Sequence, residues 1–234
     1  MLAELYDAFC AGRRDFDFYL PKVMSAESVL DVGCGTGELL RLARQEGHTG
    51  RLCGLDPADA MLAQARRERG VEWVLGNLTS VDWEQEFELI VMTGHAFQVL
   101  VEDDEIRDAL GAIRSALTDE GRFVFETRNP QVREWESWVP ENAVTIEHNG
   151  SAVKMAHRVE QPVAGDVVSF TATFSSPRWD SPIVSRSTLR FLSNDNLGGF
   201  LDDAGLVIEE QYGDWDRQPL SRVSPEIITV AMLG

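Results

Sequence analysis

The chain has 234 residues, of which 44% are hydrophobic, and its 39 acidic and 21 basic residues give a formal net charge of -18. This length suffices for one large domain or two small ones with a sizeable core. The acidic balance repels a polyphosphate backbone, so the composition argues against DNA or RNA as a partner. The longest aliphatic run, Leu89 to Met92, is far shorter than a membrane-spanning helix requires.

The cysteines and the first twenty residues indicate where the protein resides. Cys10, Cys34 and Cys53 are too few and too scattered for a disulfide framework, and none has the spacing of a zinc site. The first twenty residues carry six charges where a signal peptide needs an apolar block. We therefore expect a cytoplasmic protein that has no metal site and no membrane partner.

Short apolar runs alternate with helical patterns in the first half of the chain. The patterns predict strands at 28–32, 51–56, 71–76, 87–92 and 122–127, and helices at 38–46, 57–69 and 102–117. The run at 87–92 is apolar throughout, which is typical of a strand buried on both faces of a parallel sheet. This alternation predicts an α/β fold with a doubly wound, mostly parallel sheet that binds ligands at the carboxyl ends of its strands.

The apolar period changes to two between about residues 143 and 192. Asn149-Gly150 between two alternating runs predicts a hairpin, and one face of the alternation is apolar. We therefore expect an antiparallel β insertion at 139–192, and a main domain formed by 1–138 and 193–234. The main domain ends with a helix after Ser193 and two strands, 206–212 and 226–232, whose short connection makes them antiparallel.

The segment VLDVGCGTG, residues 29–37, places three glycines between a predicted strand and a predicted helix. The dinucleotide pattern G-x-G-x-x-G fails here, because Glu38 or Leu40 occupies the place of its third glycine. Glycines at 33, 35 and 37 bend the chain and leave no Cβ between the backbone and a ligand. Asp31 offers a carboxylate to a cationic group, so the loop favours a positively charged ligand over a pyrophosphate.

Polar residues after the next two strands indicate a nucleoside. Asp56 ends the second strand, where a carboxylate can accept hydrogen bonds from both ribose hydroxyls. Asn77 can pair with an adenine edge, and Met61 and Leu78 can sandwich the ring. A nucleoside that carries an ammonium group and no phosphate is S-adenosylmethionine (SAM).

On these motifs the chain resembles a class I SAM-dependent methyltransferase. The likeness comprises VLDVGCGTG at 29–37, GLDPADAML at 54–62, GNLTSVDW at 76–83, LTDEGRFVFET at 117–127 and FLDDAGLVIEEQYGDWD at 200–216. It implies a Rossmann-like sheet of seven strands with the last strand antiparallel. LYDAF near the N-terminus, the RNP after the fifth strand, the insertion and the ending YGDWD...SPEIITVA resemble small-molecule methyltransferases, including sugar N,N-dimethyltransferases.

The resemblance also implies which residues hold SAM. Asp31 and the backbone of Gly33 to Gly35 would hold the methionine moiety, Asp56 the ribose, and Asn77 with Leu78 the adenine. The predicted cofactor site consists of Asp31, Gly33, Cys34, Gly35, Gly37, Asp56, Pro57, Met61, Asn77, Leu78 and Thr93. The alternative is that Asp31 only caps a turn and Asp56 only caps the helix at Pro57.

The segment TGHAFQ at 93–98 follows the fourth strand and should lie beside the sulfonium. His95 is the candidate general base, because an imidazole titrates near neutral pH; the alternative is a packing histidine that takes no proton. The substrate candidates lie near the N-terminus, after the fifth strand or in the insertion: Tyr6, Tyr19, Arg128, Trp135 and Arg178. Their alternatives are core packing or ordinary surface contacts, and the insertion is either a substrate lid or a homodimer contact.

The predicted function is methyl transfer from SAM to nitrogen or oxygen of a small molecule, which leaves S-adenosylhomocysteine (SAH). Two alternatives remain at this point. One is a regulatory protein that binds SAM or SAH without turnover, and the other is an NAD(P)-dependent oxidoreductase, which the failed glycine spacing disfavours.

Overall fold

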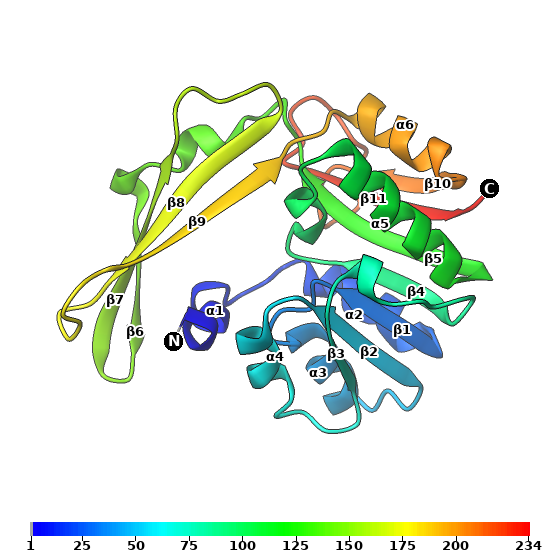
Figure 1. The fold of residues 1–234 in the computed structure, drawn as a ribbon, viewed down its shortest axis with the longest axis horizontal. Coiled ribbons are helices and arrows are strands. Elements are labelled where there is room, and N and C mark those ends of the chain that lie inside the picture. The colour runs from blue at the N-terminus through cyan, green and yellow to red at the C-terminus, as the bar shows by residue number, and fades with distance from the viewer. Residues whose placement is uncertain (1) are drawn as a thin grey trace.

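The computed structural model describes residues 2–234, and its larger sheet has seven strands (Figure 1). These strands are β1 (Ser28–Val32), β2 (Arg51–Asp56), β3 (Glu72–Leu75), β4 (Phe87–Met92), β5 (Leu117–Arg128), β10 (Leu206–Tyr212) and β11 (Glu226–Leu233). Their order is β10-β11-β5-β4-β1-β2-β3. Strand β11 is antiparallel to both of its neighbours, and β1 to β5 pair in parallel, so the predicted sheet with its antiparallel last strand is confirmed.

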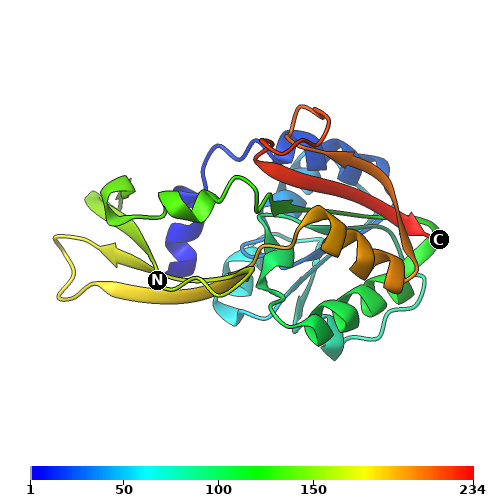
Figure 2. The same ribbon diagram turned by 90° about the horizontal axis from the view of Figure 1, so that it is seen from above.

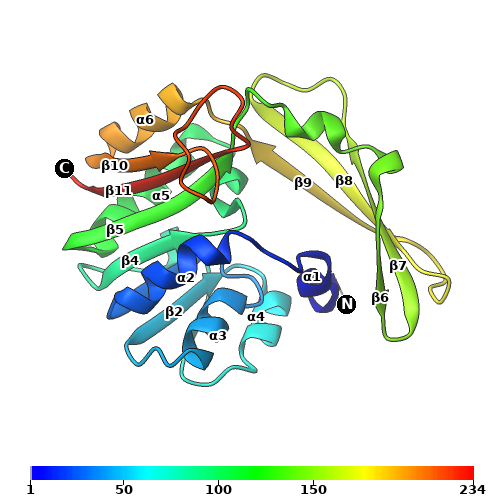
Figure 3. The ribbon, with the colours of Figure 1, turned by 180° about the vertical axis from the view of Figure 1, so that it is seen from behind.

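Helices cover both faces of this sheet. They are α1 (Leu2–Phe9), α2 (Phe16–Ser25), α3 (Glu38–Gln45), α4 (Asp59–Ala65), α5 (Asp103–Ala116) and α6 (Asn194–Asp203), with short 3-10 helices η1 (Leu78–Ser80), η2 (Ala96–Val99), η3 (Glu134–Ser137) and η4 (Pro140–Asn142). Helices α5 and α6 cover one face and α2 and α3 cover the other (Figures 1 and 3). Their apolar side chains belong to two different core clusters, one on each face. No helix in the described part of the chain is long and apolar enough to cross a membrane.

Strand β5 begins earlier than the sequence pattern indicates. We expected a turn at TDEG before a strand at 122–127, but β5 already starts at Leu117. Its pairing with β4 shifts register between Phe87 and Leu89, which marks an irregularity in the strand. A Cβ at Gly121 would lie 2.9 Å from the Phe87 carbonyl oxygen, so only glycine fits where the two strands approach. The turn residues are thus part of the strand.

The insertion is a separate sheet of four antiparallel strands: β6 (Val144–His148), β7 (Ser151–Val159), β8 (Val167–Ser175) and β9 (Ile183–Arg190). The predicted hairpin at Asn149-Gly150 joins β6 to β7, and both residues have positive φ. Helix α1 lies between this sheet and the larger one (Figures 1 and 2). The apolar face of the insertion meets the chain's own elements, since Phe9 of α1 packs on Phe174 and Trp138 packs on Phe170.

Candidate active site

The glycine loop at 33–37 connects the carboxyl end of β1 to α3. Its three glycines have positive φ values of 73°, 57° and 75°, a backbone region that side chains with a Cβ rarely adopt. At Gly37, a Cβ would lie 2.3 Å from the ring of Trp73, and at Gly33 it would lie 2.9 Å from Ala96. The spacing of the glycines therefore follows from both backbone conformation and close packing.

Asp31 at the end of β1 is a buried carboxylate without a full set of partners. Its side chain is 1% exposed, and its Oδ1 atom makes no hydrogen bond within residues 2–234. Burial raises the pKa of Asp31 to about 7, although Arg13 nearby acts in the opposite direction. A buried carboxylate of this kind needs a cationic hydrogen-bond donor, and an amino acid ammonium group supplies one. The residues present therefore fit the methionine end of SAM.

Asp56 at the end of β2 joins the glycine loop to the start of α4. Its Oδ2 accepts a hydrogen bond from the Gly35 amide, and its Oδ1 accepts one from the Ala58 amide, each at 2.8 Å. Asp56 thus holds the turn before α4, whose N-cap residue is Ala58, and does not itself cap the helix. Each carboxylate oxygen can accept a further hydrogen bond, so these contacts do not prevent Asp56 from binding ribose hydroxyls.

The residues expected around adenine lie at the start of η1 and near the start of α4. Asn77 is exposed and its Oδ1 caps η1 by accepting from Thr79, which leaves its amide nitrogen available to a base. The Leu78 side chain is buried and packs into the core shared with α5. Met61 is half-buried and Pro57 is exposed, both near the start of α4.

Cys34 and Thr93 are buried beside the loop. The Cys34 sulfur lies where a Cβ on Gly54 would approach it within 2.9 Å, and burial raises the pKa of this thiol well above its usual value. Thr93 is 8% exposed and directly follows β4. Both side chains therefore pack beside the glycine loop, and the Cys34 thiol is neutral there.

A pocket of about 350 Å³ lies at the carboxyl ends of β4 and β5. Its lining comprises Tyr6, Cys10, Ala11, Gly12, Arg13, Arg14, Asp15, Gly94, His95, Glu126, Arg128, Trp215 and Glu226. The pocket adjoins the glycine loop, because the ring of Tyr6 lies 4.0 Å from the Cβ position of Gly35. This is the position that a methyl acceptor would need relative to a donor held by the loop. We refer to this cavity as the acceptor pocket.

His95 is fixed at the acceptor pocket by two hydrogen bonds. Its backbone has a positive φ of 62°, its amide donates to Glu126 Oε1 at 2.8 Å, and its Nε2 lies 2.9 Å from Glu226 Oε2. Burial, and next to it the positive charge of Arg128, lower the pKa of His95 to about 4. Both effects disfavour the protonated imidazole, which makes His95 a weaker base in this pocket than an exposed histidine.

The five substrate candidates separate into two groups. Tyr6 and Arg128 line the acceptor pocket. Tyr19 is fully buried with its hydroxyl bonded to Glu126, and Trp135 packs edge-on against Phe191 at 4.5 Å. Arg178 lies at the far hairpin of the insertion, where it donates to the Asn149 carbonyl. Core packing thus accounts for Tyr19 and Trp135, and a surface contact accounts for Arg178.

Five charged residues of the acceptor pocket escaped the sequence reasoning: Arg13, Arg14, Asp15, Glu126 and Glu226. Arg13 forms an ion pair with Asp15 and stacks over Phe16. Glu126 is 0% exposed and directly follows the buried apolar run Phe123 to Phe125 of β5, and Glu226 begins the last strand. A charged residue at the end of a buried apolar run was the signal for Glu126, whereas nothing local distinguishes Arg13 or Glu226.

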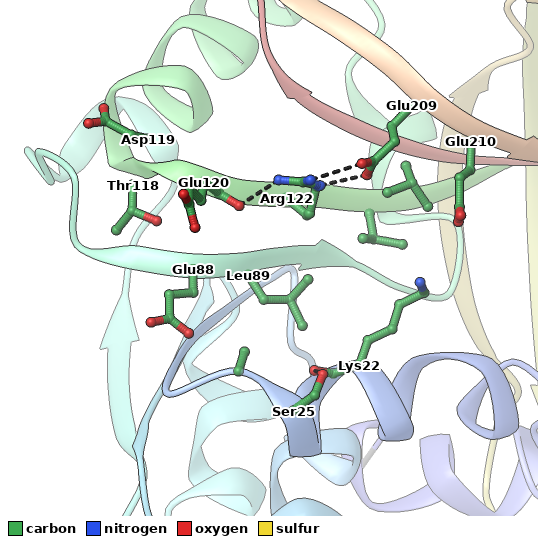
Figure 4. A pocket seen from close by; sticks show the side chains of 13 residues that line it. Lys22, Ser25, Glu88, Leu89, Thr118, Asp119, Glu120, Arg122, Glu209 and Glu210 are labelled. Atoms are coloured by element: carbon green, nitrogen blue, oxygen red, sulfur yellow. Dashed lines mark hydrogen bonds and ion pairs between the residues drawn. The ribbon is translucent and has the colours of Figure 1, made fainter.

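A larger groove, of about 850 Å³, lies elsewhere on the molecule (Figure 4). It lies between α2 and the amino ends of β4 and β5, away from the glycine loop. Figure 4 shows Arg122 directed at Glu209 across this groove, with Glu88 and Lys22 on its walls. We interpret it as a charged surface groove that is separate from the acceptor pocket.

Known proteins resemble this chain in part of its sequence and in its whole fold. Residues 29–121 match the methyltransferase domain family. The 2-phytyl-1,4-naphtoquinone methyltransferase of Thermosynechococcus vestitus is 31% identical over 54% of this chain and 60% of its own length. A dTDP-4-amino-2,3,4,6-tetradeoxy-D-glucose N,N-dimethyltransferase of Saccharopolyspora spinosa is 26% identical over 88% of this chain and 86% of its own.

The coverage of such relatives varies. The chain spans 43% of the length of a candidate methyltransferase of Geobacillus sp., to which it is 30% identical. Across this match and the naphtoquinone enzyme, the chain therefore covers about half of each relative.

Solved structures match the chain over its full length. A SAM-dependent methyltransferase of Clostridium acetobutylicum has a TM-score of 0.79 at 16% identity and covers 100% of this chain and 98% of its own. The SAM-bound amino pentose methyltransferase CalS10 of Micromonospora echinaspora has a TM-score of 0.75 at 20% identity, covering 100% and 97%. Residues 29–121 thus match the methyltransferase domain family, and the whole chain has the fold seen in SAM-dependent methyltransferases.

Proposed function

We propose that the protein transfers a methyl group from SAM to a small-molecule acceptor. The observation that carries this proposal is Asp31, a buried carboxylate with an unpaired oxygen beside a loop that only glycines can form. When bound, SAM supplies a methyl group on a sulfonium, which a nucleophile takes by in-line displacement. The work of the protein is to align the acceptor, exclude water and accept a proton.

The chain's own residues divide the binding of SAM among them. Asp31 pairs with the ammonium group, and the amides of the loop approach the methionine moiety closely. Asp56 accepts the ribose hydroxyls, since its two oxygens retain acceptor capacity beyond the Gly35 and Ala58 amides. The side-chain amide of Asn77 pairs with the adenine edge, and Met61 packs on the ring.

We place the accepting atom on nitrogen, in a molecule small enough for the acceptor pocket. Carboxylates of Asp15, Glu126 and Glu226 line this pocket together with three arginines, of which Arg13 is paired with Asp15 and Arg128 with Glu134, while Arg14 is exposed. Such a lining favours an acceptor that arrives with a positive charge, which an alkylammonium ion carries and an alcohol does not. The relative from Saccharopolyspora spinosa is named as an N,N-dimethyltransferase, which also supports nitrogen.

Location and assembly complete the proposal. The three cysteines are free thiols, which supports a reducing cytoplasm. The insertion acts as a substrate lid, because its apolar face is directed at α1 and Trp138. A homodimer through the insertion would use its edge strands β6 and β9, and light scattering would measure it.

The proposal is tested by binding and turnover. We expect calorimetry to detect binding of SAM and SAH but not NAD, and methyl-labelled SAM to label members of a panel of small primary amines. Asp56→Ala should weaken SAM binding at least about tenfold, because it removes the acceptor of the ribose hydroxyls. Glu209→Ala, in the separate groove, should bind SAM like the unmodified protein.

Three results would contradict this function in different ways. Full SAM affinity in Asp56→Ala would exclude the proposed cofactor site. Binding of NAD without SAM would favour an oxidoreductase. Binding of SAM with no turnover of any acceptor would favour a regulatory protein.

A further inference from the structure

Glu226 begins β11 and lines the acceptor pocket. Its Oε2 atom lies 2.9 Å from His95 Nε2, and its side chain is 13% exposed. Within residues 2–234, no side chain or backbone amide donates a hydrogen bond to its Oε1 atom. One oxygen of this carboxylate is thus held by His95, and the other remains available to a ligand in the pocket.

His95 is arranged to hold that carboxylate. The His95 amide is fixed to Glu126, and its left-handed backbone is set by the turn after Gly94. Because Nε2 faces Glu226, a neutral imidazole with its proton on Nε2 donates to an ionised Glu226 carboxylate. The same nitrogen cannot simultaneously take a proton from an acceptor.

The two partners differ strongly in basicity. Burial raises the pKa of Glu226 to about 8, and the charges of Glu134, Asp214 and Asp15 act in the same direction against that of Arg128. The pKa of His95 is lowered to about 4 by burial and by Arg128. The carboxylate is therefore the stronger base of the pair, and its pKa lies about two units below those of alkylammonium ions, near 10, whereas that of His95 lies about six units below them.

Charged groups from every neighbouring element face this pair. The start of α2 contributes Asp15, and β5 contributes Glu126 and Arg128. Arg128 is itself ion-paired with Glu134 of η3 at 2.7 Å, which reduces its ability to neutralise Glu226. Because Arg13 is paired with Asp15 and Arg128 with Glu134, the carboxylates of Glu126 and Glu226 have no arginine or lysine ion-pair partner within residues 2–234, and a cationic acceptor can bind beside them.

We propose that Glu226, and not His95, receives the proton of the acceptor amine, and that His95 is a positioning residue for its carboxylate. This inference rests on the methyltransferase function proposed above. An ammonium acceptor gives one proton to Oε1 of the ionised Glu226 and becomes a neutral amine. The amine lone pair then forms the new N–C bond while the S–C bond breaks, and the electrons of that bond remain on sulfur.

The first test follows the imidazole of His95 by NMR, in protein labelled with ¹⁵N-histidine and with His95→Asn to assign its signals. In the unmodified protein we expect the His95 resonances to shift in a step near pH 8, where Glu226 ionises. Glu226→Gln should abolish this step, and Glu209→Gln should retain it. The proposal is overturned if the step is missing in the unmodified protein or persists in Glu226→Gln.

A second measurement addresses turnover. With a labelled primary amine, Glu226→Gln should lower kcat by roughly a hundredfold, while the KM for SAM stays unchanged. Glu226→Asp, which keeps the carboxylate, should recover part of the rate and covers the case in which Glu226→Gln does not fold. Unchanged kcat in folded Glu226→Gln would overturn the inference.

The two proposals fail separately. If calorimetry detects no SAM binding, the methyltransferase function fails whatever the His95 resonances do. If SAM binds and amines are methylated but the step near pH 8 is missing, only the assignment of Glu226 fails.

Discussion

Asp31 is a single buried side chain whose unpaired oxygen indicates the charge of its ligand. A carboxylate that is 1% exposed and has an unpaired oxygen destabilises the folded chain on its own, because burial disfavours its charge. An ammonium group placed against it would remove that cost. The free energy that the buried charge costs the ligand-free protein is therefore recovered when a cation binds, which raises the affinity for that cation.

Replacing Asp31 by Asn should stabilise the ligand-free protein at alkaline pH. The pKa of Asp31 in the folded protein, about 7, lies above its value in the unfolded chain. The folded protein therefore loses stability as the pH rises from about 4 to 7 and Asp31 ionises. Asparagine does not ionise, so the variant avoids this loss. At pH 8 we expect a gain on the order of 2–4 kcal/mol, or a Tm about 5–10 °C higher by calorimetry.

The same substitution should weaken SAM binding about tenfold to a hundredfold, since it removes a charge-assisted hydrogen bond. Near pH 4 the Tm of Asp31→Asn should match that of the unmodified protein. An equal or lower Tm at pH 8 would contradict a destabilising charge at this position.

Helix α1 connects the glycine loop to the insertion. Its Asp7 accepts a hydrogen bond from the Thr36 hydroxyl in the loop, while Phe9 packs on Phe174 of β8. An isolated helix of eight residues is unstable in water, so these contacts decide whether α1 is formed. The position of α1 beside the glycine loop therefore depends on a few side-chain contacts.

Asp7→Ala should loosen α1 without unfolding the protein. Loss of one hydrogen bond is worth about 0.5–1.5 kcal/mol, which corresponds to about threefold to tenfold faster amide exchange in α1. Hydrogen-exchange mass spectrometry measures this, with α6 as an internal reference. Asp17→Ala, on the exposed side of α2, is the matched control. Equal acceleration in α6 would indicate global destabilisation instead.

Local pattern predicted most elements of the fold because their apolar runs are buried. The bounds of β1, β2 and β4 agree with the sequence prediction, since each has a buried apolar run with clear flanking residues. The bounds of β10 also agree, although Val207 and Ile208 of its apolar run are exposed. The start of β5 escaped prediction because Gly121 permits a close approach to Phe87, a contact between distant residues. The separate insertion was likewise predictable from its period of two.

The net charge of -18 should make the stability of the whole molecule depend on salt. Self-repulsion destabilises a compact acidic protein, and raising the salt from 0.01 M to 0.3 M shortens the screening length from about 30 Å to less than 10 Å. At pH 7.5 we expect the Tm to rise by a few degrees over this range. Calorimetry would measure it, and near the pI of about 4.5 the effect should vanish. A Tm that falls with salt at pH 7.5 would exclude dominant self-repulsion.

By itself, the sequence determined the α/β sheet, the antiparallel insertion and the character of the glycine loop. These depend on periodicity, on apolar runs and on backbone conformations that only glycine adopts readily, all of which are local properties. The proposed donor followed from the same local motif, through Asp31 and Asp56.

Only the tertiary structure decided which groups share the acceptor pocket. His95 and Glu226 are 131 residues apart in sequence, and β11 brings them together by pairing with β5. Burial and neighbouring charges then make His95 a weak base and Glu226 a strong one, which residue type alone does not indicate. The same packing assigned Tyr19 and Trp135 to the core. Basicity is set by the surroundings of a group, and those surroundings exist only in the folded chain.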